Sequence, residues 1–263
     1  MKIEFLGTGA ADWSSDSWVG RTDYRRYSSA LINGDLLIDP GPHVCDYMKK
    51  KNNPELFAGL KNILVTHSHQ DHYCLDTIRT LCMQYNCAVW GYSTIHYRNQ
   101  NAENFPEQLK QMRFTAIEPG RPVSIGNYQV TPLPSNHNSN NPLGEIPLNY
   151  LVEQNEKKLF YGLDSAWLTV SAWECLRKKS VDLYILDCTV GFHDDDWRIF
   201  SHSGVKMCSM IRESFLKNKD CKEGAKFVLS HFARTLLPEQ EKLEKKLENT
   251  GLIAAYDGMI LLV

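Results

Sequence analysis

The chain has 263 residues, of which 43% are hydrophobic and 23% are charged. This balance allows a sizeable buried core and excludes a disordered chain, a collagen and a coiled coil. The 29 Lys and Arg residues nearly balance the 31 Asp and Glu residues, and a net charge of -2 does not favour long-range attraction to nucleic acid or to an anionic membrane.

The first part of the chain alternates short apolar runs with turn signals, a pattern typical of strands. We expect strands at Lys2–Leu6, Ser28–Ile32, Leu36–Asp39 and Asn62–Thr66. Asn33-Gly34 separates the second strand from the third and predicts a tight hairpin turn. Apolar residues at helical spacing follow the fourth strand and predict a helix over Cys74–Met83.

The rest of the chain mixes predicted strands with predicted helices. We expect strands at Ala88–Tyr92, Val123–Leu133, Asn149–Glu153, Leu159–Leu163, Leu183–Leu186, Phe227–Leu229 and Leu252–Val263. We expect helices at Ala166–Arg177, Ser203–Leu216 and Pro238–Asn249. Strands followed by this mixture indicate an α/β protein with layered sheets flanked by helices. No linker-like stretch divides the sequence, so we expect one domain over residues 1–263.

The N-terminus and the cysteines bear on the cellular compartment. The first apolar run ends at Leu6, which is too short for the core of a signal peptide. No window reaches the length of a membrane span, so we expect a cytoplasmic protein that does not bind membranes. The 8 cysteines form no Cys-x-x-Cys pair, and in a reducing compartment we expect free thiols.

One segment, His67-Ser68-His69-Gln70-Asp71-His72, concentrates side chains that bind divalent transition ions. In a chain of this composition, chance would produce this pattern of three His and one Asp about six times in ten thousand. Positions 67, 69 and 71 point the same way in an extended chain, and position 72 can turn to the other side. The loop can therefore supply ligands to two ions, and a polar loop whose histidines bond to each other is the alternative.

Three more candidate ligands each follow an apolar strand. They are His137, Asp164 and His231, which follow the predicted strands ending at Leu133, Leu163 and Leu229, respectively. Any one of them alone would more often be a surface group. Their repeated placement favours a shared site, because loops at one edge of a sheet can converge.

With these residues in place, the sequence resembles the metallo-β-lactamase superfamily, whose fold is a four-layer αββα sandwich. Three segments match its pattern in order: Phe5-Leu6-Gly7-Thr8-Gly9, Leu37-Ile38-Asp39-Pro40-Gly41 and His67–His72. The resemblance implies two divalent ions, and zinc and manganese both suit the ligand types. It assigns His67, His69 and His137 to one ion, Asp71, His72 and His231 to the other, and Asp164 to both. Asp39 resembles a structural aspartate that supports the metal loop and is not a ligand.

A second pair of motifs bears on the branch of this superfamily. Asp187, followed by Ser201-His202-Ser203-Gly204, resembles the acid–histidine pair of the phosphodiesterase branch. That branch includes tRNA 3′-processing nucleases and the cyclic phosphodiesterases of the carbon–phosphorus lyase pathway. The segments Ser28–Ala30 and Ala255–Met259 favour the cyclic phosphodiesterases.

Each of these two groups has a feature that this sequence lacks. The cyclic phosphodiesterases carry a cysteine cluster for a structural zinc, but residues 11–29 contain no cysteine, so we expect no such zinc. The nucleases carry a long basic, Gly-rich insertion that grips tRNA. Here only 37 residues separate Asp164 from His202, and the overall charge is near neutral, so we do not expect tRNA as the substrate.

The acid–histidine pair has a physical interpretation of its own. Ser201 or Ser203 can cap the predicted helix, and His202 at its N-terminus, together with Ser203, can bind phosphate oxygens. Asp187 can keep the imidazole of His202 protonated, which suits the protonation of a departing alkoxide. The alternative is a buried Asp–His bond that only ties a loop. Loop side chains that we expect to shape the pocket are Trp13, Trp18, Tyr24, Arg25, Arg26, Trp197 and Arg198.

The sequence thus predicts a dinuclear metal-dependent phosphodiesterase that attacks a small phosphodiester, such as a ribosyl cyclic phosphate, with a metal-bridged hydroxide. Asp71, Asp187 and His202 are the predicted catalytic residues. The alternatives are hydrolysis of a lactone, thioester or β-lactam, tRNA 3′ processing, and a metal-bound scaffold without activity. The sequence is compatible with a homodimer.

Overall fold

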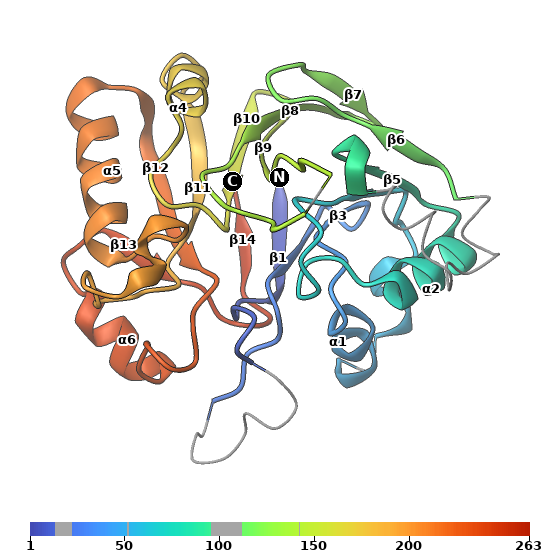
Figure 1. The fold of residues 1–263 in the computed structure, drawn as a ribbon, viewed down its shortest axis with the longest axis horizontal. Coiled ribbons are helices and arrows are strands. Elements are labelled where there is room, and N and C mark those ends of the chain that lie inside the picture. The colour runs from blue at the N-terminus through green and yellow to red at the C-terminus, as the bar shows by residue number, and fades with distance from the viewer. Residues whose placement is uncertain (14–22, 52, 96–111, 142) are drawn as a thin grey trace.

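The computed structural model of the chain describes residues 1–13, 23–51, 53–95, 112–141 and 143–263. Its described strands form two seven-stranded mixed sheets that pack face to face (Figure 1). The two chain ends meet, because the Met1 amino group donates a hydrogen bond of 2.9 Å to the carbonyl oxygen of Val263.

The first sheet is built mainly from the first half of the chain. Its strands, in spatial order, are β14 (Ile260–Leu262), β1 (Lys2–Gly7), β2 (Ser29–Ile32), β3 (Leu36–Ile38), β4 (Asn62–Leu64), β5 (Ala88–Gly91) and β6 (Phe114–Ala116). The helices α1 (Val44–Lys50) and α2 (Leu75–Tyr85) cover its outer face (Figure 1). A short 3₁₀ helix, Pro54–Phe57, follows α1.

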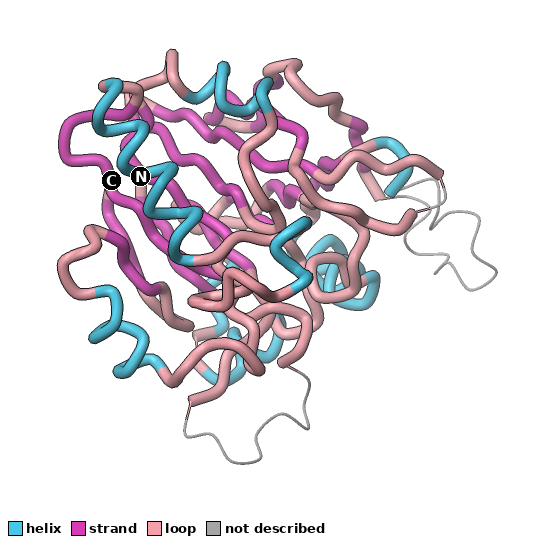
Figure 2. The backbone as a smooth tube through the Cα atoms, turned by 60° about the vertical axis from the view of Figure 1, so that its left-hand side comes forward, coloured by secondary structure: helices cyan, strands magenta, loops and turns pink. Residues whose placement is uncertain are grey.

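The second sheet is built from the second half. Its strands, in spatial order, are β13 (Leu252–Ala254), β12 (Cys221–Ser230), β11 (Val181–Asp187), β10 (Lys157–Gly162), β9 (Leu148–Gln154), β8 (Tyr128–Pro134) and β7 (Val123–Ile125). Its outer face is covered by α4 (Val170–Leu176), α5 (Val205–Asn218) and α6 (Gln240–Leu247). A second 3₁₀ helix, Trp197–Phe200, precedes α5. Figure 2 shows helices outside the sheets.

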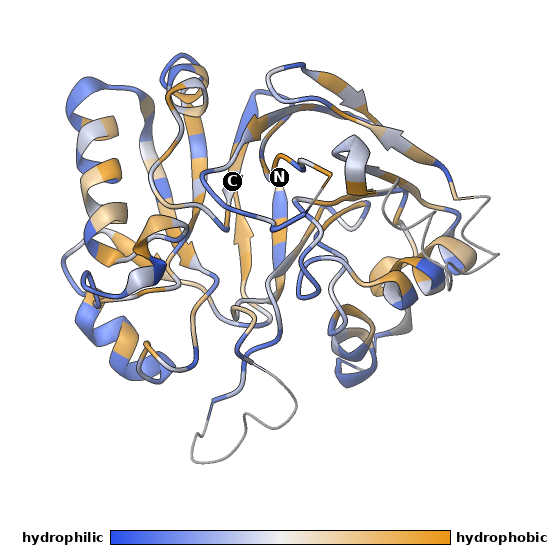
Figure 3. Ribbon diagram, viewed as in Figure 1, coloured by the Kyte–Doolittle hydropathy of each residue, from blue (hydrophilic) through white to orange (hydrophobic). Residues whose placement is uncertain are grey.

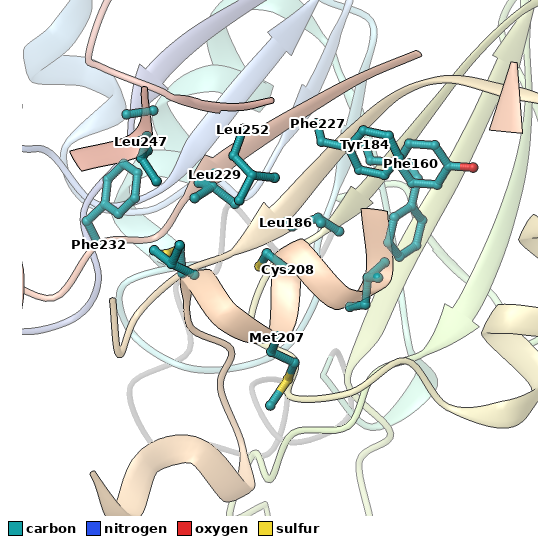
Figure 4. Packing of buried hydrophobic residues seen from close by; sticks show 14 of the residues in the cluster. Phe160, Tyr184, Leu186, Met207, Cys208, Phe227, Leu229, Phe232, Leu247 and Leu252 are labelled. Atoms are coloured by element: carbon teal, nitrogen blue, oxygen red, sulfur yellow. The ribbon is translucent and has the colours of Figure 1, made fainter. Parts of the chain in front are cut away.

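Alternation along the strands creates three apolar layers, because successive side chains point to opposite faces of a sheet. Leu183 and Ile185 of β11 pack between the two sheets, whereas Tyr184 and Leu186 pack beneath the helices of the second sheet. Figure 4 shows that helix-side cluster, where Tyr184 stacks on Phe227 with ring centres 4.6 Å apart. The apolar strands occupy the interior and the helices turn hydrophilic sides outward (Figure 3). The predicted αββα order is confirmed.

The first half follows the expected strand order closely. Strands β1 to β5 and helix α2 lie within two residues of their predicted bounds. Asn33 and Gly34 have φ values of +49° and +79°, and β2 and β3 form an antiparallel pair around them. Positive φ at both central residues is the backbone of the twisted two-residue turn that joins hairpin strands, so the hairpin prediction is confirmed.

Two predicted strands are wrong, because each is interrupted by a turn. The stretch Val123–Leu133 turns at Gly126, whose φ is +57°, and becomes the antiparallel pair β7 and β8. The stretch Leu252–Val263 turns at Asp257-Gly258 and sends β13 and β14 to different sheets. In this second stretch, β14 pairs with β1 and β13 pairs with β12, and these pairings override the continuous apolar pattern.

The helix boundaries also differ from the predicted ones. Helix α4 starts at Val170 instead of Ala166, because the Thr169 hydroxyl accepts a hydrogen bond from the Ala172 amide and caps the helix there. Helix α6 starts at Gln240 instead of Pro238. Strand β12 is longer than the predicted Phe227–Leu229, and α1 and β6 were not expected. None of the described helices is both long and apolar enough to span a membrane.

Candidate metal centre

The His67–His72 segment begins three residues after the end of β4 and is held by the loop that follows a neighbouring strand. Asp39 follows β3, the parallel neighbour of β4, and its Oδ1 accepts hydrogen bonds from the amide and the hydroxyl of Thr66, at 2.9 and 2.8 Å. Its Oδ2 lies 2.8 Å from Nδ1 of His72. One buried carboxylate therefore fixes both ends of the turn that carries the predicted ligands.

The seven predicted ligands come together, although they derive from distant stretches of the chain. In each of three sets, the candidate ligand atoms lie within 4.8 Å of one another: His67, His69 and His137; Asp71, His72 and His231; and His67, His72 and Asp164. The first two sets are those that the resemblance to the superfamily assigned to separate ions. Asp164 lies with members of both, as expected of a shared ligand.

The outward nitrogen of several imidazoles is occupied by an oxygen. His137 Nδ1 lies 3.2 Å from the Ser201 carbonyl oxygen, and His231 Nδ1 lies 2.7 Å from the Thr189 hydroxyl. A carbonyl oxygen can only accept, so His137 donates there and directs the lone pair of Nε2 inward. The Asp39 carboxylate acts in the same way on His72. Such outer partners orient the imidazoles that bind metals.

The inner nitrogen and oxygen atoms of the ligands lie close to one another. His72 Nε2 lies 2.9 Å from Asp164 Oδ2 and 3.3 Å from His231 Nε2, and His67 Nε2 lies 2.8 Å from His69 Nδ1. Asp164 Oδ2 is buried and lies within 3.2 Å of the inner nitrogens of both His72 and His231. Lone pairs that converge on one small volume fit divalent cations, so the donor set suits the expected ions.

Protonation of most of the cluster agrees with this interpretation. Burial lowers the pKa of His67 well below its usual range and lowers that of His137 to about 4, so both imidazoles are neutral, the form that binds metal. Burial alone would raise the pKa of Asp71 and Asp164, but nearby imidazoles, His72 among them, hold both well below their usual range. The two carboxylates are therefore anionic. Burial alone would lower the pKa of His72, but the Asp164, Asp71 and Asp39 carboxylates raise it well above its usual range, so this imidazole must release a proton when it binds a metal.

Asp187 and His202 form the predicted acid–histidine pair beside the cluster. Asp187 Oδ2 lies 2.8 Å from His202 Nδ1, and its Oδ1 accepts hydrogen bonds from the amides of Thr189 and Ser203. Burial alone would lower the pKa of His202, but the Asp187 carboxylate contributes most to raising it to about 9. Because Nδ1 is engaged, Nε2 is the nitrogen left to meet a substrate.

The predicted helix cap is wrong. Gly204, and neither Ser201 nor Ser203, is the N-cap residue of α5. The buried Ser203 hydroxyl donates to the carbonyl oxygens of Ser165 and Ala166 and does not line the pocket described below. Its position gives no support to the predicted substrate contact, and His202 precedes the helix instead of beginning it.

A pocket of about 220 Å³ opens onto the cluster, and the described residues that line it are Ala10, Ala11, Asp12, His69, Asp71, His137, Asp164, Thr189, Arg198, His202, His231 and Ala233. His67 and His72 lie beneath it and are fully buried. Five of the seven predicted ligands therefore line the pocket, and His202 lines it with them.

Of the described loop side chains that we expected to shape the pocket, only Arg198 lines it. Trp13 is buried and its indole donates to the Phe232 carbonyl oxygen, and the Arg25 guanidinium donates to the Ala255 carbonyl oxygen. Tyr24 and Arg26 are half-buried outside the lining, and Trp197 is 75% exposed. Trp18 lies outside the described residues. These assignments, apart from Arg198, are therefore not supported.

Sequence reasoning missed the groups that orient the imidazoles. Thr189 received no role from the sequence, although its hydroxyl lies 2.7 Å from His231 Nδ1 and 3.1 Å from His202 Nδ1. Its place two residues after Asp187 was the available signal. The Ser201 carbonyl has no such signal, because every residue carries a backbone oxygen.

Comparison with known proteins agrees with this fold. The family model described as "Beta-lactamase superfamily domain" matches residues 35–232. Zinc-bound PqqB from Methylobacterium extorquens superposes with a TM-score of 0.73 and 17% identity, covering 100% of each chain. Human tRNase Z, short form, gives 0.66 and 18%, and yeast PDE1 gives 0.68 and 12%; each comparison covers 100% of this chain and 99% of the other.

Two curated sequences match, each over a short stretch only. A glucose-1-phosphate adenylyltransferase from Clostridium botulinum is 29% identical over 80 residues, which is 30% of this chain. The chain spans 21% of the length of that relative, so the match does not identify a shared activity. The family match covers most of the chain and includes every predicted ligand. The chain belongs to the β-lactamase superfamily and is a metal-dependent hydrolase of the metallo-β-lactamase fold.

Proposed function

We propose that the chain is a dinuclear phosphodiesterase that acts on a small phosphodiester. The observation that carries this proposal is the position of His202. Its imidazole is held by Asp187 and lines the same pocket as the predicted ligands. A hydrolase that attacks only a carbonyl carbon has less need of a protonated imidazole beside the metal ligands.

The ligands would be divided between two divalent ions, with zinc or manganese as the metal. His67, His69 and His137 would hold the first, Asp71, His72 and His231 the second, and Asp164 both. When bound, such ions supply Lewis acidity and a nucleophile from water at neutral pH. Burial of His67 and His72 beneath the pocket keeps bulk water from competing for their ligand nitrogens.

The protein groups around the pocket would then orient the substrate and move the proton. Asp71 lines the pocket, and its carboxylate can accept a hydrogen bond from the attacking water and align it. His202, protonated at neutral pH because of Asp187, can donate from Nε2 to the ester oxygen that leaves phosphorus. Arg198 can pair with a phosphoryl oxygen, although Asp196 holds its guanidinium at 2.8 and 2.9 Å.

The size of the pocket and the fold of the neighbours support a small phosphodiester. A volume of about 220 Å³ suits a phosphate with one compact ester arm, such as a ribosyl cyclic phosphate. The neighbour tRNase Z is, by its name, a nuclease of tRNA, so its substrate is also a phosphodiester. The net charge of -2 argues against tRNA itself as the substrate of this chain.

The test is side-by-side turnover by protein loaded with zinc or with manganese. Bis(p-nitrophenyl) phosphate and a ribosyl cyclic phosphate form one arm, and a panel of lactones, a thioester and a β-lactam forms the other. We expect hydrolysis of the phosphodiesters and its loss in His202→Ala. Activity on the second arm alone would overturn the proposal. Accurate 3′ trimming of tRNA with strongly salt-dependent binding would identify a nuclease instead.

A further inference from the structure

Glu145 is a buried carboxylate that no predicted role absorbs. It lies in the loop of residues 135–147 between β8 and β9 and is only 9% exposed. Its Oε1 accepts a hydrogen bond of 2.7 Å from the Ser68 amide. Its Oε2 accepts hydrogen bonds from the Ser68 hydroxyl and from the Asn141 side-chain amide, at 2.5 and 2.6 Å.

Within the described part of the chain, no cationic side chain balances the charge of Glu145. All three of its hydrogen-bond donors are neutral, and no lysine or arginine of the described ranges forms an ion pair with it. Glu153 on β9 shows the usual arrangement, since Lys179 lies 3.0 Å from its carboxylate. A buried carboxylate that lacks a cation destabilises a fold, so a positive charge near Glu145 is expected.

The position of Glu145 indicates where that positive charge would lie. Ser68, which donates two hydrogen bonds to Glu145, stands between His67 and His69. The loop that carries Glu145 also carries His137. Glu145 therefore connects the two chain segments that supply the first ligand set, His67, His69 and His137. Its carboxylate is bonded to Ser68, the residue between His67 and His69.

The second ligand set has a different support. Asp71 and His72 belong to the turn that Asp39 fixes, and His231 is held by Thr189. None of the three is bonded to Glu145 or to Ser68 among the described contacts. The two sets are thus supported by different carboxylates: Glu145 for the first set and Asp39 for the second.

We propose that Glu145 is a positioning residue for the first ligand set: it fixes the separation between the His67–His69 segment and His137, and its charge favours the cation held there over the cation of the second set. This rests on the ligand assignment of the proposed function. It predicts that loss of the carboxylate weakens one ion and leaves the other unchanged.

The test measures zinc affinity by competition with a chromophoric chelator, in wild type and in Glu145→Gln, which keeps the shape and removes the charge. We expect one ion to bind about 10–100-fold more weakly, the effect typical of groups that support ligands, and the other to keep its affinity. The matched control is Glu153→Gln, which removes a carboxylate from the neighbouring strand and should leave both affinities unchanged.

A double-mutant comparison identifies the ion that is affected. His69→Ala removes a ligand of the first set, so adding Glu145→Gln to it should change the remaining zinc affinity by less than about twofold. In cobalt-loaded protein, Glu145→Gln should change the visible absorption of one ion only. Thermal unfolding of the metal-free variants serves as the check on folding.

Several results would overturn the inference. Equal weakening of both ions, or unchanged affinities with a lower unfolding temperature of the metal-free protein, would make Glu145 a structural residue only. If Glu145→Gln does not fold, Ser68→Ala, which removes one donor to the same carboxylate, should weaken the first ion in the same direction by a smaller factor. Failure of wild type to bind zinc at all would contradict the proposed function and not this inference alone.

Discussion

The two sheets supply the candidate metal centre in different ways. The first contributes four candidate ligands from one six-residue turn after β4, and Asp39 supports them. The second contributes His137, Asp164 and His231 singly, after β8, β10 and β12. The first contribution depends on local sequence, whereas the second depends on the register of strands that are far apart in the chain.

Strand register explains how the second contribution converges. Strands β10, β11 and β12 are parallel neighbours, with Gly162 opposite Leu186 and Asp187 opposite Ser230. Their carboxyl ends therefore lie at one edge of the sheet, which brings Asp164, Asp187 and His231 together. A substitution in the first half should then act on the turn alone, while one in the second half can remove a group shared by both ions.

The largest effect is expected for Asp164→Ala, since this residue belongs with ligands of both sets. Loss of the shared carboxylate should abolish tight binding of both ions and lower kcat/KM on the order of 10³-fold or more, because the charge stabilisation by metal amounts to several kcal/mol. Metal content and turnover of bis(p-nitrophenyl) phosphate are the measurements. Asp182→Ala serves as the control. Asp182 lies at the opposite end of β11, does not line the pocket, and has its carboxylate 2.9 Å from the Lys222 amino group.

The next effect separates chemistry from metal binding. His202→Ala should lower kcat by about 10²–10⁴-fold, as expected for loss of a general acid, and should leave two ions bound. Elemental analysis and steady-state kinetics on one preparation give both values. His193→Ala, which removes an exposed imidazole of the preceding loop, should match wild type in both. Loss of an ion in His202→Ala would show that this residue is a ligand and not an acid.

A smaller effect tests the local character of the first contribution. A Cβ on Gly41 would lie 2.1 Å from the carbonyl oxygen of Asp71, so Gly41→Ala must push the ligand turn away from β3. We expect metal affinity to fall about 10–100-fold, the range seen when groups that support ligands are lost. Chelator competition measures it. Unchanged affinity would mean that the turn adapts and that its geometry is not critical.

The smallest effect is expected at the hairpin of the same sheet. Gly34 has a φ of +79°, and a Cβ there would meet nothing within 4 Å. Gly34→Ala should therefore cost about 1 kcal/mol of folding free energy, from backbone strain alone, and leave activity unchanged. Urea unfolding and turnover distinguish this position from Gly41. An equal loss of activity in both variants would contradict the local account.

The contrast between the sheets also explains what could be predicted from the sequence. The turn from His67 to His72 could be recognised because its ligands are adjacent. His137, Asp164 and His231 could be proposed only because each follows an apolar strand, and the fold placed them as expected. The assignment of each ligand to an ion stays a prediction.

Features that depend on long-range pairing could not be predicted. Nothing local shows that Ile260–Leu262 returns to pair with β1, where Leu262 stands opposite Lys2. The same holds for Glu145, whose role arises only once the loop of residues 135–147 meets Ser68. The Ser201 carbonyl is invisible in the sequence for a related reason, because only the fold selects one backbone oxygen among many.

The most direct test of the account is the number of transition ions bound per chain. Wild-type protein is stripped with chelator, reloaded with zinc or manganese, dialysed and analysed by inductively coupled plasma mass spectrometry, with Asp164→Ala treated in parallel. The account predicts about two ions per chain in wild type and fewer than one in the variant. Fewer than one ion in wild type, or two ions retained without Asp164, would contradict it.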